Sequence, residues 1–261
     1  MMKQLNLEQM KSIQPLFTFV KNTLVDTCIR KNIGKVWADD DIHPNCVQVF
    51  VGDFCFLAGD SDNEQAVDLI KNIPLNYPKN NCFMVAENQK WEHLIEAEYG
   101  VHCHKVSRYS TKNNVQFDHY QLRKFVNQLP KGYRLAKIDS DLYNRALQED
   151  WSRDFCVNFR DFEDFSKNGL GIVITYGKEL VGGASSYIAT EDTLEVEIAV
   201  KENYRHRGFA TICAAQLILQ ALSRGMYPSW DAANLISFKT AEKLGYELDQ
   251  EYTAFVVDLV V

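Results

Sequence analysis

The alternation of apolar and polar residues predicts a small α/β unit in the first half of the chain. Two apolar runs, 47–51 and 54–58, flank Gly52-Asp53 and predict a β-hairpin. Beyond the hairpin, helical and strand periods alternate, which is typical of an α/β arrangement. The expected elements are a helix over 63–73, a strand over 81–86, a helix over 89–99 and a strand over 101–111.

The second half predicts a different order of elements. Proline and glycine in Leu129-Pro130-Lys131-Gly132 interrupt both helices and strands, so we expect two domains, 1–130 and 131–261. The centre of this half is a three-stranded meander with short turns. The expected strands are 133–138, 171–176, 179–188, 193–200, 227–230 and 251–259. One or two helices are expected between the N-cap Ser140-Asp141 and Asn168-Gly169, and further helices over 208–225 and 235–244.

Two details of the second half carry structural expectations. Trp151, Phe155, Phe159 and Phe162 recur at spacings of four, four and three, which predicts one face of a helix. That face would belong to the core or form the wall of a substrate pocket. Gly182-Gly183 lies inside a meander strand and predicts a bulge or a close backbone approach.

The composition is that of a globular protein, and it excludes some classes of binding partner. The 261 residues are 46% apolar and 24% charged, and the net charge of −7 with a pI near 5.4 argues against a nucleic-acid binder. No leader pattern and no run of ~18 apolar residues is present, so we expect no membrane partner and a cytoplasmic protein. The seven scattered cysteines are expected to be buried, reduced thiols.

The strongest chemical signal is a strand that runs into a basic turn at the start of a helix. The turn contains Arg205-His206-Arg207-Gly208, and an apolar helical stretch follows it. The first turn of a helix presents unpaired N–H groups that bind phosphate, and arginines add charge-assisted hydrogen bonds. The segment therefore predicts a pyrophosphate-type ligand. The alternative is an ordinary helix start beside an incidental basic loop.

The residues of this turn resemble a known family. Arg205-x-x-Gly208-x-Ala210 is similar to the acetyl-CoA pyrophosphate loop of the GNAT superfamily of N-acetyltransferases, and Asn234-x-x-Ser237 with Gly245-Tyr246 resembles its second block. The resemblance covers about 131–261 and implies a mixed α/β fold with a splayed central sheet. The first half would be a smaller, divergent α/β domain, expected to be a degenerate copy. The run 227–234 resembles the bacterial subgroup that includes the zwittermicin A resistance protein.

The resemblance also implies the residues that contact acetyl-CoA. Main-chain groups at the end of the third meander strand would bind the pantetheine arm as an added strand would, the loop would hold the pyrophosphate, and Asn234 would contact the arm or cap its helix. The implied cofactor-binding residues are Ile198, Ala199, Val200, Arg205, His206, Arg207, Gly208, Phe209, Ala210, Thr211 and Asn234.

Catalysis requires a base, because an amine with a pKa of ~10 is an ammonium ion at pH 7. Glu195 and Glu197 lie two residues apart on the third meander strand, so both face the same way. Either is a candidate base or a solvated outer residue, and Asp231 and Tyr252 are weaker candidates. Many family members carry a Tyr as general acid where this chain has Ala241. The alternatives are Ser237, Tyr246 or unaided departure of the thiolate.

The resulting hypothesis is an N-acetyltransferase that moves an acetyl group from acetyl-CoA directly to a primary amine of a small molecule. A non-catalytic acyl-CoA-binding module and a protein-amine acetyltransferase are the alternatives. Strand alternation puts His102 and His104 on one face, but no further ligand is close in sequence, so we expect no metal site. Dimerisation of the chain stays open.

Overall fold

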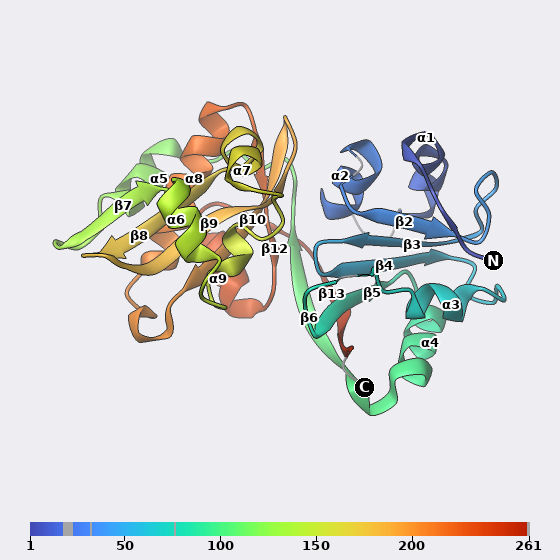
Figure 1. Ribbon diagram of the computed structural model, residues 1–261. Coiled ribbons are helices and arrows are strands. Elements are labelled where there is room, and N and C mark those ends of the chain that lie inside the picture. The colour runs from blue at the N-terminus through green and yellow to red at the C-terminus, as the bar shows by residue number, and fades with distance from the viewer. Residues whose placement is uncertain (18–22, 32, 76, 260–261) are drawn as a thin grey trace. The chain divides into compact units, whose positions relative to one another are not determined.

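The computed structural model describes residues 1–17, 23–31, 33–75 and 77–259 and divides the chain into two compact units (Figure 1). The first unit is Met1–Arg108 with the chain from Tyr252 onward, and the second is Tyr109–Glu251. This division differs from the boundary expected at residue 130. Helix α5 (His119–Val126) lies in the second unit because its Leu122 is buried in the core of that unit.

The first unit is built on a sheet with the strand order β1-β2-β3-β4-β5-β13. All neighbouring pairs are antiparallel except β4 and β5, which are parallel. The strands are β1 (Lys3–Gln4), β2 (Lys35–Ala38), β3 (Cys46–Val51), β4 (Phe54–Gly59), β5 (Asn81–Ala86) and β13 (Leu248–Asp258). The helices are α1 (Leu7–Met10), η1 (Lys11–Leu16), α2 (Thr23–Lys31), α3 (Ala66–Lys71) and α4 (Gln89–Tyr99), and η2 (Gly100–His102) precedes β6 (Cys103–Thr111).

The predicted hairpin and both predicted helices of this unit are confirmed. Gly52 forms the turn between β3 and β4 with a φ of 60°, a left-handed conformation that favours glycine. Helix α4 begins where Asn88 accepts hydrogen bonds from the backbone N–H groups of Lys90 and Trp91. Apolar side chains of α3 and α4, among them Leu69 and Ile95, share one core with the sheet.

The second unit is built on a five-stranded sheet with the order β11-β10-β9-β8-β7. Its strands are β7 (Tyr133–Lys137), β8 (Gly171–Tyr176), β9 (Glu179–Ala189), β10 (Thr193–Val200) and β11 (Tyr227–Ser229). Its other elements are α6 (Ser140–Ala146), η3 (Arg153–Phe155), α7 (Phe162–Asn168), η4 (Glu202–Tyr204), α8 (Phe209–Ser223), β12 (Asp231–Ala232) and α9 (Leu235–Lys243). The meander is as predicted, and α8 fills the core on one side of it.

The two units share one succession of strand pairings. From β1 to β5 three antiparallel pairs are followed by a parallel pair, and the same succession runs from β7 to β11. The first half of the chain therefore repeats the order and direction of strand pairings found in the second.

The prediction of one aromatic helix around residues 151–162 is wrong. Turns and η3 occupy this segment, and α7 begins only at Phe162. Two side chains stop a continuous helix: the Ser152 hydroxyl donates to the carbonyl of Ala146, and Asp161 caps α7. Asp139, one residue before the predicted Ser140, caps α6. The aromatic residues still share one apolar cluster.

Both expectations for Gly182-Gly183 are confirmed. The register between β8 and β9 shifts at Ile174, which leaves Val181 beside Gly182 as a bulge. At Gly183 an added Cβ would lie 2.7 Å from the ring of Phe155, so only glycine fits under that ring. Within the described ranges we find no helix with the length and apolar character needed to cross a membrane.

Candidate active site

Strand β11, at one edge of the five-stranded sheet, pairs with only the first part of β10, and the two strands then part. Their parallel ladder covers Thr193 to Glu195, and β10 then continues to Val200. The residues beyond the ladder include Ile198, Ala199 and Val200, and all three are half-buried. The expected splayed sheet is therefore present, and this edge of β10 can offer main-chain groups to an extended ligand.

The start of α8 is open at the position where phosphate binding was expected. Gly208 precedes the helix with a φ of 79°, and no side chain caps the helix there. An added Cβ at Gly208 would meet no heavy atom within 4 Å. His206 also has a left-handed backbone, with a φ of 62°, a conformation that clusters at functional sites. Phe209 is buried, while Ala210 and Thr211 are half-buried.

The two arginines of the turn are exposed and held by different partners. Arg205 Nε donates to the carbonyl oxygen of Val200 at 3.3 Å, which connects the turn to the end of β10. Arg207 Nη1 donates to the Tyr133 hydroxyl at 3.0 Å, and its guanidinium lies 5.2 Å from the ring centre of Tyr204. Both cations thus lie beside the uncapped end of α8.

Glu195 and Glu197 share one face of β10, as predicted, but their environments differ. Leu194 and Val196 on the opposite face are buried in the core around α8. Glu195 is only 5% exposed, and its Oε1 accepts a hydrogen bond from the backbone N–H of Asp231 at 2.6 Å. This bond ties β10 to β12 beyond the end of the β11 ladder, which gives Glu195 a structural task.

Glu197 is half-buried and lies next to η3. It pairs across the β9–β10 ladder with Ser185, whose hydroxyl donates to the carbonyl oxygen of Phe155 at 2.9 Å. Cross-strand partners lie on the same face of a sheet. Glu197 therefore faces the side of the sheet that η3 covers.

Asn234 and Ser237 lie at the start of α9. Asn234 caps the helix, since its Oδ1 accepts from the backbone N–H of Ser237 at 2.9 Å. Trp230 Nε1 donates to the Ser237 hydroxyl oxygen at 3.2 Å, so the hydroxyl keeps its own proton for another acceptor. The capping alternative for Asn234 is thus confirmed, and a contact to a ligand remains a prediction.

Ala241 and Tyr246, two of the positions considered for a general acid that protonates the leaving thiolate, are both buried. Ala241 is fully buried, so no side chain there reaches a ligand. The Tyr246 hydroxyl donates to the Pro228 carbonyl oxygen at 2.8 Å, and burial raises the pKa of this tyrosine well above its ordinary value. Tyr246 therefore holds β11 in place, which leaves Ser237 as the side chain from the sequence analysis with an available proton.

Sequence reasoning missed Lys201, Glu149 and Glu179. Lys201 follows β10 directly, and its Nζ lies 3.0 Å from Glu149 Oε2 and 3.1 Å from Glu179 Oε1. The three residues are far apart in the sequence and belong to no motif. The only signal was a lysine at the junction between the strand and the basic turn.

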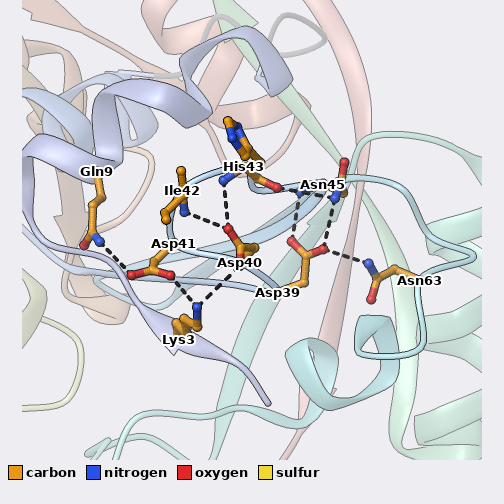
Figure 2. Close-up of polar contacts among 9 residues, drawn as sticks. All are labelled: Lys3, Gln9, Asp39, Asp40, Asp41, Ile42, His43, Asn45 and Asn63. Carbon is orange, nitrogen blue, oxygen red and sulfur yellow. Dashed lines mark hydrogen bonds and ion pairs between the residues drawn. The ribbon is translucent and has the colours of Figure 1, made fainter.

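A dense polar cluster in the first unit is structural (Figure 2). Asp40 accepts from the backbone N–H groups of His43 and Ile42, which lowers its pKa to about 2, while Asp39 accepts from Asn45 and Asn63. These bonds shape the loop between β2 and β3. Across the described ranges, no group of three or more His, Cys, Asp or Glu side chains could hold a metal ion.

Comparisons with known proteins agree with this geometry. The family model described as GNAT acetyltransferase matches residues 14–255. The uncharacterized N-acetyltransferase YdfB of Bacillus subtilis is 26% identical, over 97% of this chain and 98% of its own. The crystal structure of a GCN5-related N-acetyltransferase-like protein from Streptococcus suis is 42% identical, with a TM-score of 0.87 over 95% of this chain and 98% of that one.

A more distant structure shares the fold alone. The tandem GNAT protein from the clavulanic acid biosynthesis pathway is 10% identical, with a TM-score of 0.55 over 100% of this chain and 99% of that one. The parted strands, the open helix start and the family match over residues 14–255 agree with one another. The chain therefore belongs to the GNAT acetyltransferase family and is an acetyltransferase of that family.

Proposed function

We propose that this chain transfers the acetyl group of acetyl-CoA to a primary amine of a small molecule. One observation carries the proposal: β10 extends beyond its ladder with β11 and leads to the uncapped start of α8, and Arg205 Nε in the turn between them donates to the carbonyl oxygen of Val200. A ligand with an extended amide chain and a diphosphate has the chemistry that suits this pair of features.

The residues around Gly208 fit the diphosphate. Its missing Cβ leaves open space at the helix start, where backbone N–H groups have no side-chain cap. Arg205 and Arg207 supply positive charge on the exposed side of the turn. In the proposal the loop from His206 to Thr211 holds the phosphates, residues 198–200 pair with the pantetheine amides, and the Asn234 side chain contacts the arm.

We assign Glu197 as the base. The Glu195 carboxylate is buried and accepts the Asp231 N–H, whereas Glu197 is half-buried beside η3. Glu197 takes the proton of the ammonium ion, directly or through water. The freed nitrogen then bonds to the thioester carbonyl carbon, the carbon–sulfur bond breaks, and the nitrogen gives up a second proton to yield the neutral amide. Two carboxylates on this face also favour a cationic acceptor.

The leaving thiolate takes up the second proton of the nitrogen, relayed by the Ser237 hydroxyl or by water. Ser237 lies at the start of α9 with its hydroxyl oxygen accepting from Trp230 Nε1, so its own proton is available to another acceptor. A free thiol has a pKa of ~8.5, so protonation at neutral pH is not a demanding step. Proximity of amine and thioester supplies much of the rate.

We also propose an acceptor class for the acetyl group and a cytoplasmic location for the protein. The resemblance of residues 227–234 to the zwittermicin A resistance subgroup points to an aminated antibiotic as one acceptor class. All seven cysteines are free, which is typical of proteins in the reducing cytoplasm.

A second candidate function is acyl-CoA binding without turnover. The buried Ala241 supports it, because no tyrosine is available there as a general acid. Incubation of the chain with acetyl-CoA and a panel of primary amines, with mass spectrometry of the products, separates the two. Acetylated amine supports the transferase, and calorimetric binding of CoA without product on any amine supports the second function. Absence of CoA binding would refute both.

A further inference from the structure

Lys201 joins two carboxylates that belong to different parts of the second unit. Its ammonium group pairs with Glu149, in the turn after α6, and with Glu179, at the start of β9. The first carboxylate also accepts from Trp151 Nε1 at 2.8 Å, and the second from the Tyr204 hydroxyl at 2.7 Å. Both carboxylates thus have a second partner, and the five residues form one connected network.

One branch of the network reaches the basic turn. The Tyr204 ring lies under the guanidinium of Arg207, which also donates to the Tyr133 hydroxyl. The Tyr133 ring packs 4.7 Å from that of Phe209, the first residue of α8. The position of Arg207 therefore depends on Tyr204, whose hydroxyl is fixed by Glu179.

The other branch reaches the segment that borders Glu197. The Trp151 ring meets the ring of Phe155 edge-on at 6.0 Å. The Phe155 carbonyl oxygen in turn accepts from Ser185, the cross-strand partner of Glu197. A displacement of the 149–155 segment would therefore change the space beside Glu197.

We propose that Lys201 is a positioning residue that couples the basic turn to the 149–155 segment. This inference rests on the proposed function, in which the turn binds CoA and the segment borders the acceptor amine. When CoA phosphates draw Arg207 toward them, the Tyr204–Glu179–Lys201–Glu149 network orders the segment around Trp151. Partly exposed ion pairs contribute little to stability, so the network acts on position rather than on folding.

Hydrogen exchange measured by mass spectrometry tests the coupling without turnover. Exchange at residues 149–156 is followed in the full chain with and without CoA, since the amides of Ser152, Arg153 and Phe155 bond within this segment. We expect CoA to slow this exchange several-fold in the wild type and to have no such effect in Lys201→Met. Lys201→Arg keeps the charge and should restore the response. Glu149→Gln is a second variant that breaks the same branch.

A matched control lies in the first unit. Lys105 also bridges two carboxylates, Glu92 and Glu96, each at 3.1 Å. Lys105→Met should therefore keep the full response of residues 149–156. An equal CoA response in Lys201→Met, or none in the wild type, would overturn the inference.

Kinetics provide the second readout. In Lys201→Met the KM for the amine should rise roughly tenfold, within the usual range of coupling between two sites, while the Kd for CoA stays within about twofold. Failure of the wild type to bind CoA refutes the proposed function and this inference together. If the wild type acetylates an amine and Lys201→Met has an unchanged KM, only the coupling fails.

Discussion

The buried carboxylate of Glu195 accepts a hydrogen bond from the backbone N–H of Asp231 at 2.6 Å. In the proposed function Glu195 is therefore structural and Glu197 is the base. Glu195→Gln weakens a charge-assisted bond in a buried site and should lower the free energy of unfolding by about 1 kcal/mol, which urea unfolding measures. Glu197→Gln changes a less buried side chain and should lower the free energy of unfolding by less than Glu195→Gln does.

Catalysis should respond in the opposite order to stability, with the larger loss of kcat in Glu197→Gln and the smaller loss in Glu195→Gln. Without its base, Glu197→Gln should lose about 10²- to 10⁴-fold in kcat at pH 7, and the loss should shrink as the pH rises and more amine is already neutral. Glu195→Gln should keep most of its kcat when assayed below its unfolding temperature. Equal kcat for Glu197→Gln and wild type would remove Glu197 from the mechanism.

Gly208 should be essential for CoA binding but not for folding. An added Cβ would enter open space, so Gly208→Ala costs only the strain of a left-handed residue, about 1–2 kcal/mol. Because that Cβ lies where the diphosphate would bind, calorimetry should show at least a tenfold weaker Kd for CoA. Gly177→Ala is the matched control, with a φ of 57° and the same open surroundings in the turn before β9. A similar Kd in the two variants would contradict the assignment of the loop.

One molecule of CoA should bind per chain, although both units share one succession of strand pairings. In the first unit β4 is followed by the acidic residues Asp60, Asp62 and Glu64 instead of a basic turn. The end of β4 is also satisfied by side chains, since Gly59 N donates to Glu87 and Gly59 O accepts from Trp91. Isothermal titration calorimetry should give a stoichiometry of one, and a value of two would place a second site in the first unit.

The thiols should be almost unreactive in the native protein. Burial raises the pKa of Cys28, Cys55 and Cys156 to about 12, and that of Cys213 higher still. Since the thiolate is the reactive form, a disulfide reagent at pH 8 should modify the half-buried Cys103 first. The other cysteines should react only after unfolding in urea. Rapid reaction of several thiols without denaturant would contradict this burial.

The Lys201 network should persist from weakly acidic to alkaline pH. Hydrogen bonds from Trp151 and Lys201 lower the pKa of Glu149, those from Tyr204 and Lys201 lower that of Glu179, and both carboxylates raise the pKa of Lys201. Because the pKa values of both glutamates are lowered in the folded state, their contribution to stability is complete above the unfolded pKa near 4.3. It is lost as the pH falls through the lower folded pKa values. The raised lysine pKa extends the pairing above pH 10.5.

Nuclear magnetic resonance can follow this titration at one atom. The indole N–H shift of Trp151, which donates to Glu149, should stay constant between pH 5 and 8 and move below about pH 4. The indole N–H of Trp91 is the internal control, because it donates to the carbonyl oxygen of Gly59, which does not titrate. A Trp151 shift that titrates near neutral pH would show that another group controls this network.

Local sequence determined many of the elements of this protein. Strand periodicity fixed β8, β9 and β10, the glycine before an apolar run fixed the start of α8, and the spacing of Arg205, Gly208 and Ala210 pointed to the correct family. These features depend on neighbours within a few residues, and such short-range preferences are visible in a single sequence.

Tertiary structure decided which acidic residue of β10 is buried and bonded to Asp231, and where the units divide. The buried bond of Glu195 depends on β12, which lies 36 residues away, and the Lys201 network joins three segments with no common motif. The sequence also did not predict the break in the aromatic segment at Ser152 or the pairing of β13 with β5. Each of these depends on long-range contacts made only when the chain folds, because residue spacing records local conformation and not the partner that a side chain meets.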